Sequence, residues 1–232
     1  YDALLGRTSN VLYGANPDHD LPEKSVALVP RLTGAHKARY PRFSPDGRWL
    51  SYLVEDETEG AMGLHLLDLT EGGADRRLVT AISSEQQVSE AVVWLPDNSA
   101  LVFTGTLEMP GVSCLFWQRF AGNAPHNEPL EVVRISPADE YTRWFSLASH
   151  GRAIAYLAGT RLLVSRLDPA TGAVDSTALT AEQVGGGTDD VFPPDGFVWS
   201  AAGDVLALRL QSGLLAVTSV TTEAPGVPML GA

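Results

Sequence analysis

Hydrophobic and polar residues alternate along several short stretches of this chain, and each of these stretches begins just after a Gly or an Asn. The first is "RWLSYLVE", in which Leu50 and Tyr52 fall on the same face of an extended strand. The same two positions recur in three later pairs: Leu101 and Phe103, Ile154 and Tyr156, Leu206 and Leu208. A period of two residues predicts β-strands whose paired positions point to a core.

A tight turn precedes each of these strands, and the number of residues between successive turns gives the length of the repeat. The turns end at Gly47, Asn98, Gly151 and Gly203, so consecutive turns lie 51, 53 and 52 residues apart. Gly and Asn are the residues that best tolerate a left-handed backbone at the end of a tight hairpin. A repeat of about 52 residues therefore extends along the chain from about Arg39.

The first turn, "SPDG", sets Ser44 beside Asp46, which could indicate either catalysis or a structural turn. The second repeat keeps Pro-Asp, whereas the third and fourth repeats have neither residue. Proline presets φ for a turn and aspartate accepts hydrogen bonds from its own backbone, so both suit a turn. The comparison favours structural turns, formed by Pro45, Asp46, Gly47, Pro96, Asp97, Asn98, Gly151 and Gly203.

Each repeat continues with a third and a fourth strand. The third strands are "LHLLDL", "CLFWQRF", "RLLVSRL" and "LLAVTSV", and the fourth are "RRLVT", "LEVVRI", "STALT" and "GVPML". Four strands in about 52 residues are typical of a β-propeller blade. We therefore predict one all-β domain over residues 1–232, a propeller or part of one, with blades at about 35–84, 85–137, 138–190 and 191–232.

Residues 1–34 are predicted to form part of an earlier blade, because "NVLYGA" and "SVALVPRLT" resemble a third and a fourth strand. Four and a half blades do not close a ring neatly. Two alternatives follow: the N-terminal strands complete the last blade, or the chain is part of a larger propeller. Because open blades expose sheet faces and edges, we expect further blades or a protein partner to cover them.

The stretches "FSPDGRWLSYL" and "WLPDNSALVF" resemble the TolB-type, WD40-like (PD40) propeller repeat. The same repeat occurs in the propeller domains of prolyl-oligopeptidase-like serine peptidases, including acylaminoacyl peptidases. The resemblance covers most of the chain as a repeat architecture, and its motif is clear in the first two repeats. In those peptidases the catalytic serine lies in a separate hydrolase domain, on a Gly-x-Ser-x-Gly elbow that this sequence lacks. The resemblance therefore transfers no catalytic residue.

Composition narrows the classes of partner. The net charge is −12, from 16 basic and 28 acidic side chains, which argues against nucleic acid and anionic membranes as partners. No apolar run approaches the ~20 residues of a membrane span. A single cysteine, Cys114 in "VSCLFW", excludes an intramolecular disulfide and any multi-cysteine metal site. The chain begins at Tyr1, which suggests a processed or partial chain. The sequence does not indicate the cellular compartment.

No pattern in the sequence predicts a catalytic residue, a metal site or a cofactor. The five histidines lack a second ligand at metal spacing. Asp18, His19 and Asp20 could hold a cation, although a proline-flanked turn is the simpler interpretation. The acidic loop 55–59 lacks the ligand order of a calcium loop, and "QVGGGTDD" lacks the context of a phosphate-binding loop.

Propeller geometry indicates where binding could occur. The tight turns share one end of the blades, and the longer loops 55–61, 81–90, 107–112 and 181–194 share the other. Loops on a rigid scaffold often carry binding sites. The candidate binding residues are Arg39, Glu55, Glu57 and Trp144, while Trp94, Trp117, Trp144 and Trp199 suit packing between blades.

Three functions remain open. The first is a non-enzymatic scaffold that binds proteins within a larger assembly. The second is the propeller portion of a prolyl-oligopeptidase-like peptidase, which would limit access to a hydrolase domain absent from this sequence. The third is an enzyme with a metal or sugar site in the central funnel of the propeller.

Overall fold

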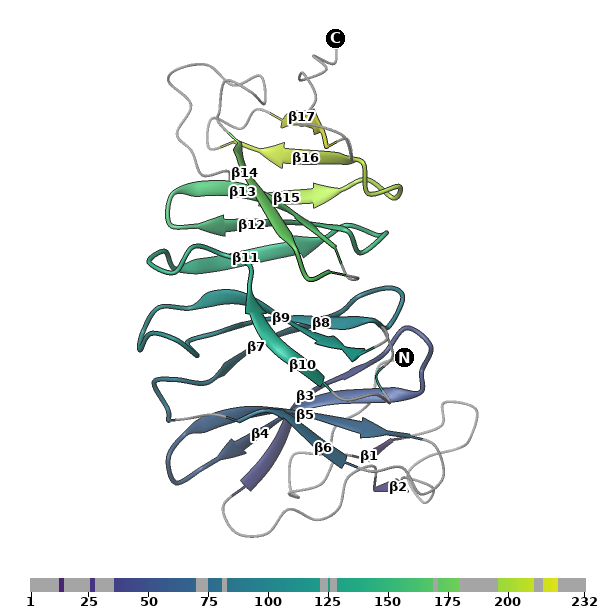
Figure 1. Cartoon of the computed structure of the whole chain (residues 1–232), viewed down its shortest axis with the longest axis vertical. Helices are drawn as coiled ribbons and strands as arrows, with labels where there is room; N and C mark the ends of the chain where they lie inside the picture. The colour runs from purple at the N-terminus through teal and green to yellow at the C-terminus, as the bar shows by residue number, and fades with distance from the viewer. Residues whose placement is uncertain are drawn as a thin grey trace. The chain divides into compact units, whose positions relative to one another are not determined.

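A computed structural model describes residues 13–14, 26–27, 36–69, 75–80, 83–121, 125, 129–168, 171–179, 196–210 and 215–220 (Figure 1). The chain forms two compact units, which we call unit 1 (residues 1–94 and 103–111) and unit 2 (residues 95–102 and 112–232). The predictions for Asp18–Asp20, for residues 181–194 and for the last strand, 226–230, lie outside the described residues.

Antiparallel sheets that follow one another along the chain make up the described fold, and each is called a blade here. Blade 1 contains β3 (His36–Phe43), β4 (Trp49–Asp56), β5 (Ala61–Asp68) and β6 (Asp75–Val79). Blade 2 contains β7 (Val88–Trp94), β8 (Ala100–Gly105), β9 (Cys114–Phe120) and β10 (Pro129–Arg134). Blade 3 contains β11 (Thr142–Leu147), β12 (Ala153–Ala158), β13 (Arg161–Leu167) and β14 (Val174–Leu179). The described part of blade 4 contains β15 (Gly196–Trp199), β16 (Val205–Arg209) and β17 (Leu215–Ser219).

The strand order within each blade follows the chain, so the predicted all-β repeat of four-stranded blades is confirmed. Of the predicted N-terminal strands, the structure describes β1 (Tyr13–Gly14) and β2 (Val26–Ala27), which pair with each other. No helix within the described ranges has the length and apolar character needed to cross a membrane.

The four predicted turns share one backbone geometry. Gly47, Asn98, Gly151 and Gly203 have φ values of 72°, 62°, 73° and 77°, in the left-handed region that favours Gly and Asn. In each turn the N–H of this residue donates to the carbonyl three residues earlier, at 2.8 to 3.0 Å. This position therefore has the backbone geometry of a tight turn in all four repeats.

The hydroxyl of Ser44 stabilises the first turn. It donates to Asp46 Oδ1 at 2.5 Å and accepts the N–H of Trp49 at 2.9 Å. In blade 4, Ser200 accepts the N–H of Val205 at 3.2 Å in the same way. In the third turn His150 replaces the aspartate, because its Nδ1 accepts the N–H of Arg152 at 3.0 Å. Different side chains thus perform the same structural task.

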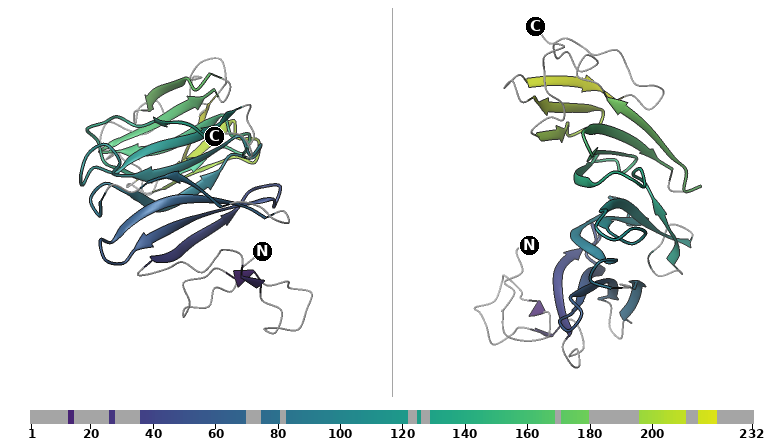
Figure 2. Two further views of the ribbon diagram at one scale, coloured as in Figure 1. Left: turned by 60° about the horizontal axis from the view of Figure 1, so that its bottom comes forward. Right: turned by 90° about the vertical axis from the view of Figure 1, so that its left-hand side faces the viewer.

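The inner strands are buried more completely than the alternating pattern predicts. Every residue of β8 and of β12 is buried, because both faces of these strands are covered. In unit 2, one face of blade 3 packs through Ile154 and Tyr156 against Val102 and Leu115 of blade 2. The opposite face packs against blade 4 in a second cluster. Figures 1 and 2 show β15, β16 and β17 beside the sheet of β11–β14.

A tryptophan at the end of a first strand links neighbouring blades. In unit 1, Trp94 Nε1 donates to the carbonyl of Arg42 at 3.3 Å and to Ser51 Oγ at 3.1 Å. In unit 2, Trp199 Nε1 donates to the carbonyl of Ser146 at 2.9 Å. These two tryptophans confirm the prediction of packing between blades. Trp144 does not fit this prediction, because 53% of its surface is exposed.

Candidate functional site

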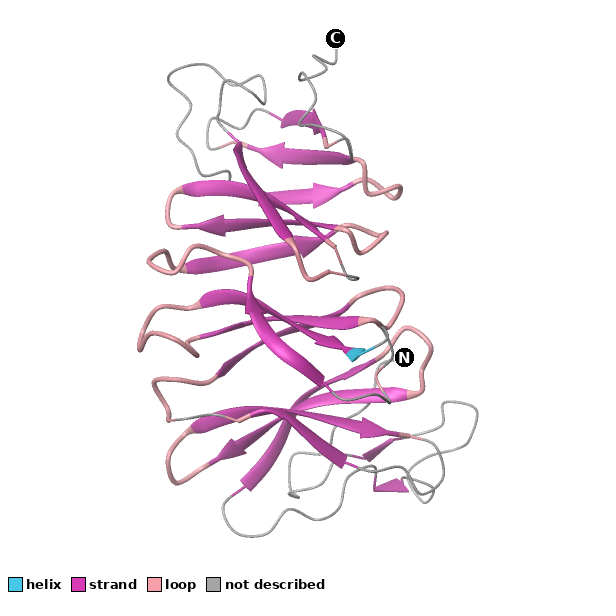
Figure 3. Cartoon of the chain, in the orientation of Figure 1, coloured by secondary structure: helices cyan, strands magenta, loops and turns pink. Residues whose placement is uncertain are grey.

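The longer loops of unit 1 gather at the end of its strands opposite the tight turns. This loop end consists of residues 36–39, 54–62, 83–89 and 105–111, and its loops are pink in Figure 3. The backbone N–H of Met62 donates to Gln87 Oε1 at 2.8 Å, which joins β5 to the segment before β7. A Cβ added to Gly60 would lie 3.8 Å from Ser84 Cβ, so the β4–β5 turn lies beside this segment.

Three of the predicted binding residues, Arg39, Glu55 and Glu57, lie at this loop end. Arg39 Nε donates to Glu55 Oε2, and Lys37 pairs with Glu57. These pairs join β3 to β4, where Lys37 lies opposite Glu55 in the register. The hydrogen bond with Glu55 raises the pKa of Arg39. Because exposed ion pairs contribute little to stability, their main effect is to orient the side chains.

A backbone irregularity lies next to Arg39. The pairing of β3 with β4 shifts register between Arg39 and Arg42, and Tyr40 has a φ of 51°. Few residues other than glycine adopt such a φ, and bulges at sheet rims redirect neighbouring side chains. The bulge therefore separates the regular β3–β4 pairing near the tight turn from the charged pairs at the loop end.

A groove of about 440 Å³ opens among these loops. Gln87 organises its floor: its N–H donates to Thr106 Oγ1 at 3.1 Å, and its carbonyl accepts the N–H of Thr106 at 2.9 Å. Its side-chain Nε2 donates to the carbonyl of Ser84 at 2.6 Å. The groove is lined by Ser84, Glu85, Gln87, Ser89, Thr106, Pro110 and Gly111.

Close packing fixes the floor of this groove. A Cβ added to Gly105 would lie 2.7 Å from the carbonyl oxygen of Gln87, so a side chain at this position would collide with backbone. The glycine allows the end of β8 to approach the segment before β7. A groove supported in this way presents its lining in a defined arrangement, as binding sites on rigid scaffolds require.

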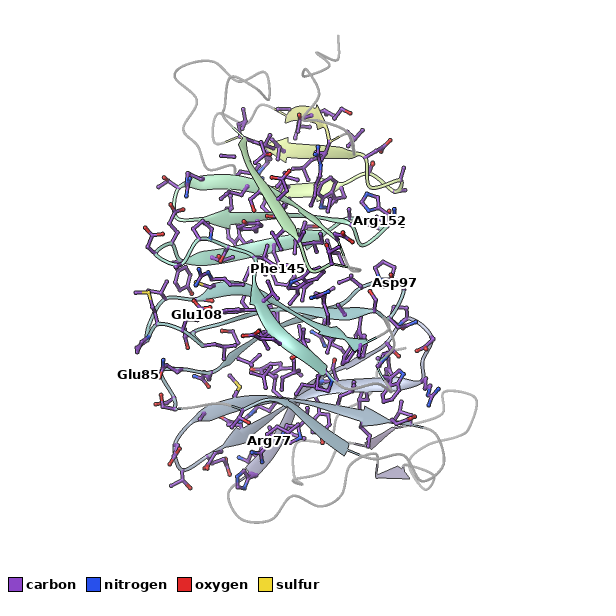
Figure 4. The ribbon with its side chains drawn as sticks, viewed as in Figure 1. Arg77, Glu85, Asp97, Glu108, Phe145 and Arg152 are labelled. Carbon is purple, nitrogen blue, oxygen red and sulfur yellow. The ribbon has the colours of Figure 1, made fainter. Side chains whose placement is uncertain are left out.

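Acidic side chains occupy the loops that carry the groove, and Glu85 is part of its lining. Glu59, Glu85 and Glu108 occupy exposed loop positions, and Figure 4 shows Glu85 and Glu108 on loops at the same side of the chain. The N–H of Thr58 donates to Asp56 at 2.9 Å and lowers the pKa of this carboxyl group, which keeps it ionised at neutral pH. Met109, 43% exposed, adds apolar surface to the neighbouring loop.

The chemistry of the groove is that of hydrogen bonding and charge. Histidine, cysteine and lysine are absent from those lining residues that the structure describes. Among the described residues, no group of three or more His, Cys, Asp or Glu side chains is arranged to hold a metal ion. Sequence reasoning identified the loops 81–90 and 107–112 but missed Gln87 and Thr106. The glycine that ends "LVFTG" was the only local signal of the close approach.

The fourth predicted residue, Trp144, belongs to β11 in unit 2. It is 53% exposed, and Tyr141, which precedes the strand, is 51% exposed. The carbonyl of Tyr141 accepts the N–H of Gly159 at 2.9 Å, and Arg161 pairs with Glu140 in the same blade. The pairing with Glu140 raises the pKa of Arg161. Trp144 is thus exposed beside an ordered hairpin and is not one of the groove residues.

Comparison with known proteins relates the whole fold to solved structures. The sequence matches no protein-family model and no curated protein sequence. A protein from Bacteroides ovatus assigned as a dipeptidyl aminopeptidase IV aligns with 89% of this chain, with a TM-score of 0.59 and 13% identity. The periplasmic gluconolactonase of Pseudomonas aeruginosa aligns with 94% of the chain (TM-score 0.52, 16% identity), and a prolyl endopeptidase with 93% (TM-score 0.52, 19% identity).

The alignments cover only part of these proteins. The chain spans 61% of the gluconolactonase and 31% of each of the other two proteins. At these identities the likeness shows the fold alone. Together with the sheets described above, it shows that this chain has an all-β fold of β-propeller blades.

Proposed function

We propose that this chain is a non-catalytic propeller scaffold that binds a protein partner at the loop end of unit 1. The observation that carries the proposal is the groove of about 440 Å³, with its floor fixed by Gln87, Glu85 in its lining, and the exposed Glu59 and Glu108 on the neighbouring loops. Hydrogen-bonding groups along the groove suit an extended peptide segment, and these carboxylates suit a segment with Lys or Arg side chains.

The roles of the predicted residues follow from this proposal. Arg39, Glu55 and Glu57 form internal pairs that orient their side chains at the loop end. The contacts to the partner come from Glu59, Glu85 and the exposed Met109, where charge steers association and apolar surface contributes affinity.

Charge reversal tests the proposal. The double variant Glu59→Lys/Glu85→Lys would be compared with Glu131→Lys/Asp175→Lys, which makes the same charge change at exposed positions of unit 2. Tagged wild-type and variant proteins would be purified from the source cells and their partners quantified by mass spectrometry. We expect the loop-end variant to lose a partner by about tenfold or more and the control to retain it. Equal recovery from both variants would overturn the proposal.

A peptidase-gating role is the second candidate, favoured by the alignments with the dipeptidyl aminopeptidase and the prolyl endopeptidase. This chain would then limit access to a hydrolase domain in the same protein. A fluorophosphonate probe, which labels active serine hydrolases, would be applied to the intact protein from its source cells. Labelling of a polypeptide that contains this sequence would support gating over the scaffold function, and a lack of labelling would count against gating.

A further inference from the structure

The outer face of blade 4 exposes an apolar surface. Val198, Leu215 and Val217 are 61%, 75% and 45% exposed, and they come from the outer two of the three described strands. Val198 lies opposite Ala207, and Ala207 lies opposite Val217, so the three strands form one continuous apolar row. The alternate residues Leu206, Leu208 and Ala216 are buried against blade 3.

In blade 3, the positions that correspond to this exposed row of blade 4 are packed against a neighbouring blade. In blade 3 the row consists of Ser146, Ala155 and Val164, which pair across β11, β12 and β13 as Val198, Ala207 and Val217 do in blade 4. We call this the forward face of each blade and the opposite side its rear face. The forward face of blade 3 is covered over β12 and β13: Ala155, Leu162 and Val164 are 0%, 0% and 5% exposed.

The forward face of blade 3 is covered by the rear face of blade 4. Leu157, Leu162 and Val164 belong to one cluster with the rear-face residues Leu206 and Leu208. The indole of Trp199 adds a hydrogen bond to the carbonyl of Ser146, in the first strand of the forward face. Blade 2 and blade 3 repeat this arrangement, because Val102 packs in one cluster with the rear-face residues Ile154 and Tyr156.

We propose that the forward face of blade 4 binds a further blade of the same repeat, supplied by polypeptide outside residues 1–232. Each packed interface of unit 2 joins a forward face to a rear face, and the forward face of blade 4 continues this series in the same register. The occupant presents large aliphatic or aromatic side chains at the positions of Leu206 and Leu208. An indole at the position of Trp199 would donate to the carbonyl of Val198.

A second copy of this chain does not fit this face. Its remaining rear face would be that of blade 1, where Leu50, Tyr52 and Leu67 are already buried, at 0%, 1% and 5% exposure. In blade 1 the tryptophan position is occupied by Phe43, whose side chain has no N–H to donate. The inference does not depend on partner binding at the loop end, because the two surfaces share no residue.

Cysteine accessibility tests the coverage of this face. Val217→Cys and Leu215→Cys place thiols on the forward face of blade 4, and Thr160→Cys places one at an exposed hairpin of blade 3 as a control. The native Cys114 is buried and gives a low background. Labelling by a polyethylene-glycol maleimide would be timed in the purified chain 1–232 and in a native extract of the source cells.

In the purified chain we expect all three introduced thiols to react at similar rates. In the native extract we expect the two forward-face thiols to react at least about tenfold more slowly, while Thr160→Cys keeps its rate. Equal reactivity of all three thiols in the extract would overturn the inference. Loss of partner binding in the loop-end variant would not change these rates, so the two proposals fail separately.

The identity of the covering segment would come from photo-crosslinking. p-Benzoylphenylalanine at position 217 would be activated in the native extract and the crosslinked peptide sequenced by mass spectrometry. The inference predicts a peptide from outside residues 1–232 with apolar residues at alternate positions after a Gly or Asn turn. A crosslink to residues 1–232, in the same or a second copy, or to a peptide without this pattern would overturn it.

Discussion

Blades 3 and 4 have the same strand pattern, yet their forward faces differ in burial. Leu162 and Val164 of blade 3 are 0% and 5% exposed, whereas Leu215 and Val217 at the same register positions of blade 4 are 75% and 45% exposed. Their rear faces are alike, since Ile154 and Leu206 are both fully buried. The contrast shows that a neighbouring sheet, rather than residue type or strand period, decides which side of a blade becomes core.

The comparison also shows which contacts join one blade to the next. Aliphatic side chains fill the interface between blades 3 and 4, and the Trp199 indole closes one edge of it. Ser149 and His150 add hydrogen bonds to the carbonyls of Ala201 and Gly203 at the tight turns. Buried apolar area is expected to dominate these contributions, so the largest effects should come from the aliphatic positions.

Truncation of one leucine in each blade gives the largest expected difference. Leu162→Ala removes a fully buried side chain and should lower the free energy of unfolding by about 3 kcal/mol. Leu215→Ala removes an exposed side chain and should change it by less than about 0.5 kcal/mol. Urea denaturation of the purified chain, followed by tryptophan fluorescence, measures both. Equal losses would show that the two faces are equally covered.

A methyl group at the turn of blade 4 should have the next largest effect. A Cβ at Gly203 would lie 2.8 Å from the ring of His150, and the φ of 77° disfavours alanine. Gly203→Ala should therefore lower the free energy of unfolding by about 2 kcal/mol. Gly47→Ala is the control, with a similar φ of 72° and open space around it, and should cost about 1 kcal/mol. The same urea titration measures whether Gly203→Ala lowers the free energy of unfolding more than Gly47→Ala does.

Removal of the indole N–H isolates the hydrogen bond between blades 3 and 4. Trp199→Phe keeps an aromatic ring but leaves the carbonyl of Ser146 without this donor. We expect a loss of about 1 kcal/mol in the free energy of unfolding. Near-ultraviolet circular dichroism should confirm that the remaining aromatic side chains keep their packing. If stability stays unchanged, the indole acts through its volume alone.

The turn hydroxyl should contribute least. Ser149 is exposed, and its Oγ donates to the carbonyl of Ala201 at 2.7 Å. Ser149→Ala should cost about 0.5 kcal/mol, since water replaces part of an exposed hydrogen bond. Amide hydrogen exchange in residues 200–205 offers a second measurement and should increase slightly. If Ser149→Ala lowered the free energy of unfolding as much as Leu162→Ala does, the hydrogen bonds between the turns, and not the aliphatic side chains, would be the main contacts between blades 3 and 4.

The repeat could be predicted from the sequence because its signals are local. The left-handed position at Gly47 and Asn98 admits few residue types, and the strand that follows alternates with a period of two. These constraints act within a few residues, so they appear in the order of the amino acids. The exchange of Asp46 for His150 was missed, because two chemically different side chains accept the same backbone N–H.

The candidate site could be predicted only in part. The sequence indicated the loops and predicted Arg39, Glu55 and Glu57 as candidate binding residues. These three residues lie together at the loop end. It did not indicate Gln87, whose side chain reaches the backbone of Met62, 25 residues away in the sequence. This contact depends on how one blade lies against the next strand, and the residues next to Gln87 in the sequence do not indicate it.

The sequence by itself determined the strands, the turns and the spacing of the blades, because each depends on the conformational preferences of neighbouring residues. Only the tertiary structure decided that Leu162 is core while Leu215 is surface, and that Trp199 is packed while Trp144 is exposed. The physical reason is that burial depends on a second sheet approaching from elsewhere in the chain. Residues with the same local pattern therefore become core or surface according to what lies against them.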